Sequence, residues 1–131
     1  MPLKITTWNI NSVRLRIDLV AKFIKSARPD VICLQETKCP DDAFPLKRFK
    51  RLGYEHAALN GQKGYHGVAV LSRVPFASID LQNFCGKSDC RHISVVLGER
   101  YVVSAEGNGV DINALKSAVG SIDLARLEAL K

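Results

Sequence analysis

Residues 30–38 read DVICLQETK, and this stretch decides the fold class because a short apolar run ends abruptly on polar side chains. The part DVICL is continuous, of strand length and preceded by Pro29, so it predicts a strand that is buried on both faces. Glu36 and Lys38 follow it directly. A carboxylate at the end of a buried strand either faces solvent or holds a ligand, and the neighbouring segments bear on that choice.

The residues before this strand predict another strand and a helix. LKITTW, at residues 3–8, alternates and carries β-branched residues, which is typical of a strand, and NIN then breaks it. A helix is expected from Ser12, a suitable N-cap, to Arg28, which stands before Pro29. Its apolar positions recur at helical spacing: Val13, Ile17, Val20, Ile24 and Ala27. The order strand, helix, strand predicts a sheet that is covered by a helix.

The remainder of the chain predicts further strands and a terminal helix. Residues 39–53 indicate a loop and a short helix that ends at Gly53. Strands at 54–59 and 67–72 flank the glycine-rich turn NGQKGYH, and strands at 92–97 and 100–105 form a hairpin. The last segment predicts an amphipathic helix, because four apolar residues fall on one face: Ile112, Leu115, Val119 and Ile122.

Length and composition favour one basic globular domain. The chain has 131 residues, of which 47% are hydrophobic, enough for one core. A net charge of +6 favours an anionic partner such as nucleic acid, and a merely soluble basic surface is the alternative. No apolar stretch approaches the roughly 18 residues that span a bilayer, and the start MPLKITTWN lacks the apolar run of a signal peptide. We therefore expect a cytoplasmic protein with no membrane partner.

The cysteines predict free thiols. They are Cys33, Cys39, Cys85 and Cys90. In a reducing compartment thiols are more often free than bridged. A zinc site is not expected, because Cys33 lies inside an apolar strand and the spacings fit no standard zinc finger.

Polar residues follow both N-terminal strands at the point where each strand ends. Asn9 and Asn11 come after the first, and Glu36 comes after the second. If the two strands are neighbours in one sheet, an amide oxygen and a carboxylate meet there, and such oxygen ligands suit Mg²⁺. Lys38 could pair with that carboxylate or face a phosphate. The alternative is that Glu36 faces solvent and Asn9 helps to turn the chain.

Several basic residues and two backbone amides are candidates for phosphate contacts. Arg14 lies near a helix start, Lys63 lies in the glycine-rich turn beside the amides of Gly64 and Tyr65, and Arg91 precedes a strand. The alternative for each is a solvated surface group.

Six ordered motifs change the balance between these alternatives. They are TWNINSVR, PDVICLQETKC, DDAFP, LGY, GQKGYHGVAVLSR and DCRHISV. Together they resemble the exodeoxyribonuclease III and apurinic/apyrimidinic endonuclease family of the endonuclease/exonuclease/phosphatase superfamily, over residues 3–97. The resemblance implies an α+β fold that is part of a four-layer αββα sandwich, like deoxyribonuclease I. Residues 1–97 would be the N-terminal half of this domain, and residues 98–131 a divergent hairpin strand and an amphipathic helix of unrelated sequence.

The resemblance also implies roles for individual residues. Glu36 looks like the family's Mg²⁺ ligand, with Mn²⁺ as the other candidate cation, and Asn9 like the asparagine beside that metal, so both are expected to be catalytic. The segments that face the DNA backbone hold five residues: Arg14, Lys63, Gly64, Tyr65 and Arg91. The implied reaction is metal-assisted phosphodiester hydrolysis in double-stranded DNA that is abasic or blocked at its 3′ end.

Other motifs of the family are missing. We find no Tyr-x-Pro, no Gly-Asp-x-Asn after an apolar strand and no Ser-Asp-His, which carry the remaining acid–base groups in the family. Asp111 and Asn113 in GVDIN reproduce only the Asp-x-Asn spacing. We therefore expect a truncated chain without nuclease activity of its own. The alternatives are a non-catalytic DNA-binding fragment and a gene remnant.

Truncation of a sandwich leads to one further expectation. Loss of the partner sheet would expose apolar strand residues, which are Val31, Cys33, Val68, Val70, Ile93 and Val95. The terminal helix would then cover that face, or the chain would self-associate through it.

Overall fold

The computed structural model describes residues 3–62, 64, 66–80, 92–97, 101–106, 109–114 and 122–127. Two α-helices lie in this part of the chain, α1 (Ile17–Ala27) and α2 (Leu46–Arg51), together with a short 3-10 turn at Asp41–Ala43. The strands are β1 (Leu3–Asn9), β2 (Val31–Gln35), β3 (His56–Asn60), β4 (Val68–Ser72), β5 (Phe76–Asp80), β6 (His92–Leu97), β7 (Tyr101–Glu106), β8 (Gly109–Ala114) and β9 (Ile122–Leu127). The expected strand, helix, strand start is confirmed.

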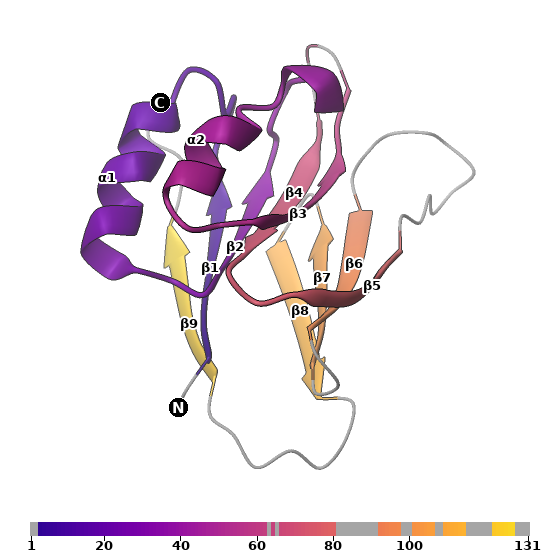
Figure 1. Ribbon diagram of the computed structural model, residues 1–131. Coiled ribbons are helices and arrows are strands. Elements are labelled where there is room, and N and C mark those ends of the chain that lie inside the picture. Colours follow the sequence, from indigo (N-terminus) through magenta and orange to yellow (C-terminus); the bar gives the residue numbers. More distant parts are fainter. Residues whose placement is uncertain are drawn as a thin grey trace.

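The strands form two sheets. The first has five strands in the order β3-β4-β2-β1-β9, with β1 parallel to both β2 and β9. The second has four antiparallel strands in the order β5-β6-β7-β8. In Figure 1 the two helices lie on one side of the first sheet and the strands of the second sheet lie on the other. The described residues thus make three layers of an α+β fold.

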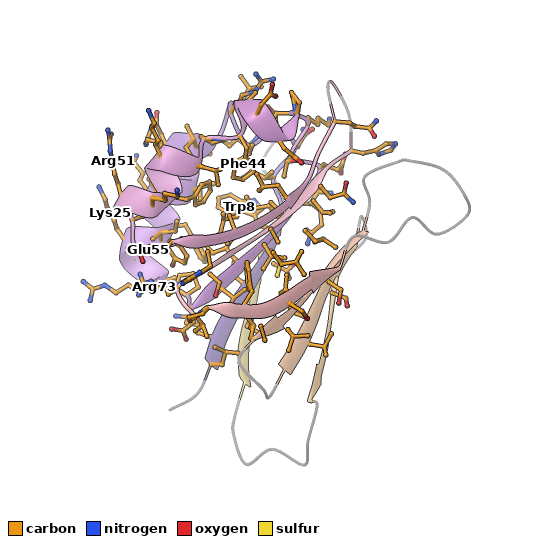
Figure 2. The ribbon with its side chains drawn as sticks, turned by 45° about the vertical axis from the view of Figure 1, so that its right-hand side comes forward. Trp8, Lys25, Phe44, Arg51, Glu55 and Arg73 are labelled. Atoms are coloured by element: carbon orange, nitrogen blue, oxygen red, sulfur yellow. The ribbon has the colours of Figure 1, made fainter. Side chains whose placement is uncertain are left out.

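One apolar core lies between the helices and the first sheet. Ile32 and Leu34 of β2 and Val20 and Ile24 of α1 belong to it. The Trp8 ring meets the Phe23 ring edge to face at a centroid distance of 5.7 Å. Figure 2 shows Trp8 between the helices and the strands. Burial of these side chains fixes α1 on the sheet, because each buried aliphatic or aromatic side chain contributes about 1.5–3 kcal/mol.

A separate core lies between the two sheets. Val31 and Cys33, which alternate with Ile32 and Leu34 along β2, face this side. Its buried residues are Ile5, Val31, Cys33, Ala58, Val68, Val70, Ile93, Val95, Leu97 and Val103. β2 is buried on both faces, as its continuous apolar sequence predicts.

The expectation of an exposed sheet face is wrong. The six strand residues named for it are all at most 1% exposed. The reason is that strands β5, β6, β7 and β8 form a second sheet, and Ile93 and Val95 of β6 pack in the core between it and the first sheet. Self-association through that face therefore has no basis in the structure.

The expected C-terminal helix is also wrong over the described residues. Gly109–Ala114 is strand β8, which pairs with β7, and Ile122–Leu127 is strand β9, which pairs with β1. The first segment also alternates apolar and polar residues over positions 110–113, so its sequence is compatible with two periodicities. Each segment pairs its backbone with an edge strand that would otherwise be unpaired, β7 for the first and β1 for the second, and this pairing favours the extended conformation.

Two smaller predictions differ from the structure. Helix α1 begins at Ile17 and not after Ser12, whose positive φ of 84° belongs to a turn. Strand β5 was not predicted, because its sequence FASID carries only a weak strand pattern. Among the described residues, neither helix is long and apolar enough to cross a membrane.

Candidate active site

Three loops meet at one edge of the first sheet. β1 and β2 are parallel neighbours, so their carboxyl ends lie side by side, with Asn9 paired to Gln35. β4 is antiparallel to β2, and its first residue Val68 also pairs with Gln35. The residues after β1, those after β2 and those before β4 are therefore brought together by the strand topology, although they are far apart in sequence.

Backbone hydrogen bonds tie these loops to one another. The amide of Ser12 donates to the carbonyl oxygen of Glu36 at 2.9 Å, and the amide of Val13 to that of Thr37 at 3.0 Å. The amide of Thr37 donates in turn to the carbonyl oxygen of Gly67 at 3.1 Å, and that of Lys38 to His66 at 2.8 Å. The loop after β2 is thus held on both sides, which fixes the positions of its side chains.

Left-handed backbone conformations gather in the same loops. Six non-glycine residues in the described part of the chain have a positive φ, and five of them lie here: Asn11, Ser12, Glu36, Lys38 and His66. Such conformations cost of order 1–3 kcal/mol each and persist where the surroundings enforce them, which occurs often at functional sites. Glu36, at φ 53°, leaves the strand in this conformation.

The side chains of Asn9 and Glu36 meet at this edge. Nδ2 of Asn9 donates a hydrogen bond to Oε2 of Glu36, and both residues are half-buried. The two side chains lie together, as the strand order predicted, but the contact is through the amide nitrogen of Asn9 and not through its oxygen. The alternative of a Glu36 that only faces solvent does not describe this geometry, because its carboxylate is held by a neighbouring strand end.

Lys38 contacts a partner other than the one expected from sequence. Its Nζ donates to Oδ1 of Asn11, while Glu36 is bonded to Asn9. Nη1 of Arg16 donates to the backbone oxygen of the same Asn11 at 2.5 Å. The contact between Asn11 and Lys38 was missed because it depends on two left-handed turns, for which the sequence carries no clear signal.

Buried polar side chains join the strands and loops that carry the site. Nε2 of Gln35 donates to Oγ1 of Thr7 at 2.8 Å, so the two strands that carry Glu36 and Asn9 are also joined by their side chains. Thr37 is 1% exposed and lies against Gly67, where an added Cβ would approach its Oγ1 to 2.2 Å. Gly67, at φ 100°, is therefore required at this position by both space and conformation.

The predicted DNA-contact residues are only partly within the described chain. Arg14 is exposed and follows the loop after β1. Burial raises the pKa of the Cys39 thiol, and the positive charge of Arg14 acts in the opposite direction. Gly64 is exposed with a φ of 86°. Lys63, Tyr65 and Arg91 lie outside the described residues.

Asp111 and Asn113 lie in β8, at positions set by its register with β7. Asp111 pairs with Ser104 and Asn113 pairs with Val102. Val103, which is buried between the sheets, pairs with Ile112.

The donor set at this edge fits a hard cation in part. Glu36 offers a carboxylate, and the bond from Nδ2 of Asn9 leaves the amide Oδ1 as a second oxygen. Mg²⁺ commonly binds through one or two carboxylates and keeps several waters. No group of three or more His, Cys, Asp or Glu side chains gathers as a metal cage within the described ranges. The residues here therefore suit an open, water-rich site.

Comparison with known proteins places most of the chain in one family. The profile of the Endonuclease/Exonuclease/phosphatase family matches residues 6–109. Exodeoxyribonuclease III of Haemophilus influenzae is 44% identical over 71 residues, which cover 54% of this chain and 26% of that protein. The chain thus spans about a quarter of the length of this relative.

Solved structures show the same fold. An AP endonuclease from Archaeoglobus fulgidus is 35% identical with a TM-score of 0.65, over 72% of this chain and 37% of that one. The 3′ phosphatase NExo from Neisseria, bound to a product DNA hairpin, is 29% identical with a TM-score of 0.69, over 84% of this chain and 40% of that one.

Proposed function

Because the chain belongs to the endonuclease/exonuclease/phosphatase family, we propose that it is part of a Mg²⁺-dependent DNA-repair nuclease of the exodeoxyribonuclease III type. Its substrate would be double-stranded DNA with an abasic site or a blocked 3′ end. The observation that carries this proposal is the hydrogen bond between Asn9 and Glu36 at the ends of two parallel strands. The names of the relatives support a DNA substrate.

In this proposal, Glu36 and Asn9 hold the metal ion. A bound Mg²⁺ would stabilise the charge that develops on the phosphate oxygens during hydrolysis. Asn9 orients the Glu36 carboxylate through its amide nitrogen. The left-handed turn at Glu36 and the backbone bonds to residues 12 and 67 keep the carboxylate in place before substrate arrives.

The DNA backbone would lie across the exposed residues around this edge. Arg14 is exposed beside the loop after β1, and Gly64, which is also exposed, lies before β4. An arginine and free amides are typical donors to phosphate oxygens. We extend the same role to Lys63, Tyr65 and Arg91 from the sequence motif alone.

We propose further that these 131 residues bind DNA and metal but do not complete hydrolysis by themselves, since the family's other acid–base motifs are not found in them. A cytoplasmic location is part of the same proposal.

The test is incubation of the purified protein with a duplex that carries one abasic site. Incision, measured on a denaturing gel with and without MgCl₂, would mean that the 131 residues already hold a complete nuclease. Retention of the duplex without incision, weakened by salt, is the expected result and indicates a DNA-binding part of one. The absence of both incision and retention would contradict the proposal. The variant Glu36→Gln removes the proposed ligand, and Glu55→Gln, an exposed glutamate before β3, is its matched control.

A further inference from the structure

Asn11 holds two cationic side chains at the edge that carries Glu36. Its side-chain Oδ1 accepts from Nζ of Lys38, and its backbone oxygen accepts from Nη1 of Arg16 at 2.5 Å. Lys38 comes from the loop after β2 and Arg16 from the turn that precedes α1, so Asn11 brings together cations from two elements. Its φ of 45° lies in the left-handed region, which asparagine tolerates better than most residues.

The partner that holds Lys38 is neutral. An amide oxygen orients the ammonium group but does not cancel its charge, unlike a carboxylate. Lys38 forms no ion pair with the part of the chain that the structure describes, and the nearby Glu36 carboxylate is engaged by Asn9. The ammonium group of Lys38 is therefore held in position by a partner that carries no charge.

The backbone of Lys38 adds to this arrangement. Its φ is 54°, and its amide is fixed to the carbonyl oxygen of His66 at 2.8 Å. The side chain is half-buried, so less of its conformational freedom remains to be lost when a ligand binds. A lysine that is fixed at both its backbone and its ammonium group is better suited to binding a ligand than to solubility alone.

We propose that Lys38, positioned by Asn11, is a phosphate-binding residue of the site, and that its ligand is a backbone phosphate of nucleic acid. This rests on the proposed function and adds to it a contact that does not require the metal ion. Asn11 acts as a positioning residue, and its neutral amide leaves the charge of the ammonium group in place. An aspartate there would pair with the ammonium group, cancel its charge and repel the phosphate.

The proposal is tested by duplex DNA binding in EDTA, where metal does not contribute. Fluorescence anisotropy over a range of salt concentrations gives the slope of log affinity against log salt, and its magnitude is about 0.9 for each phosphate that the protein neutralises in B-DNA. We expect Lys38→Met to reduce the magnitude of the salt slope by about 0.9, the value for one phosphate. Lys25→Met, on the outward side of α1 in Figure 2, removes the same charge and is expected to leave the slope unchanged.

Asn11→Asp separates a binding role from a structural one. It is expected to lower DNA affinity in EDTA while the midpoint of urea unfolding stays equal or rises, because the new ion pair with Lys38 replaces the present hydrogen bond. A merely structural contact would leave DNA binding unchanged in this variant. Equal slopes for Lys38→Met and Lys25→Met, or no salt-sensitive binding by the unmodified protein, would overturn the proposal.

The two proposals fail independently. If the Lys38 slope change is absent but Glu36→Gln weakens Mg²⁺ binding, the phosphate contact falls and the nuclease proposal stands. If the slope change is present but neither Mg²⁺ binding nor any metal effect on DNA is found, the phosphate contact stands and the nuclease proposal falls.

Discussion

Nδ2 of Asn9 donates a hydrogen bond to Oε2 of Glu36, and this single contact joins the carboxyl ends of two adjacent parallel strands. The two residues are separated by a helix and a strand in the chain, and the parallel pairing of β1 and β2 brings them together. A carboxylate that is oriented by an amide before any ligand binds is suited to holding a cation.

Glu36→Gln is expected to weaken Mg²⁺ binding by at least about 10-fold, because the carboxamide removes the charge that a hard cation requires. The amide of Asn9 can still donate to the new carbonyl oxygen, so the fold should be retained. Isothermal titration with MgCl₂ measures the affinity, and circular dichroism checks the fold. The exposed Glu55→Gln should bind as the unmodified protein does. Equal affinities for both variants would exclude Glu36 as a ligand.

Gly67→Ala is expected to destabilise the protein more than Gly64→Ala. Both glycines have a positive φ, of 100° and 86°, so both substitutions carry a cost of about 1–2 kcal/mol for the left-handed conformation. Of the two, only Gly67 would place the added Cβ against another atom, Oγ1 of Thr37 at 2.2 Å. We expect an additional loss of about 1–3 kcal/mol from this overpacking, measured by urea unfolding. Equal losses at both positions would show that the loops are not in close contact.

Ile93→Ala tests the packing of the second sheet on the first. Ile93 is 0% exposed in the core between the sheets, and a cavity there is expected to lower the free energy of unfolding by about 2–5 kcal/mol. Ile79, on β5, is 50% exposed and serves as the matched control. Ile79→Ala should cost within about 0.5 kcal/mol, as is usual for surface substitutions. Similar losses for the two variants would contradict the docking of the two sheets.

Cys33 should make the protein less stable at alkaline pH. Burial raises the pKa of its thiol from 9.0 to about 12. Between these values the unfolded chain has lost the thiol proton while the folded chain keeps it, so the free energy of unfolding falls as pH rises. The largest slope is about 1.4 kcal/mol per pH unit.

Cys33→Ala should reduce this slope between about pH 9 and pH 10, the interval that begins at the ordinary thiol pKa of 9.0, and Cys39, whose thiol pKa is also raised by burial, contributes the remaining thiol part. Above the ordinary pKa of 10.0 for a tyrosine, Tyr54 contributes in the same direction, because burial raises its pKa to about 12. The measurement is urea unfolding at several pH values, with Cys39→Ala as a control that keeps the Cys33 contribution. A slope in Cys33→Ala as steep as that of the unmodified protein would exclude this origin.

At the candidate site, the sequence identified side chains but not all of their contacts. The proximity of Asn9 and Glu36 could be predicted, because the sequence shows where each strand ends and parallel neighbouring strands end at the same edge of a sheet. Lys38 was expected near Glu36, and the structure instead gives it Asn11 as partner. That contact depends on left-handed turns at residues 11 and 38, which are set by hydrogen bonds to other loops.

By itself the sequence determined the first strand, helix and strand, because their apolar periods agree with the breaks at Asn9 and Pro29. It also determined the family, through motifs in residues 3–97. Only the tertiary structure decided that residues 109–114 and 122–127 are strands, and that Val31, Cys33 and Ile93 are covered. The physical reason is that a segment with both helical and strand periodicity follows its pairing partners, and the open edges of β7 and β1 supply them.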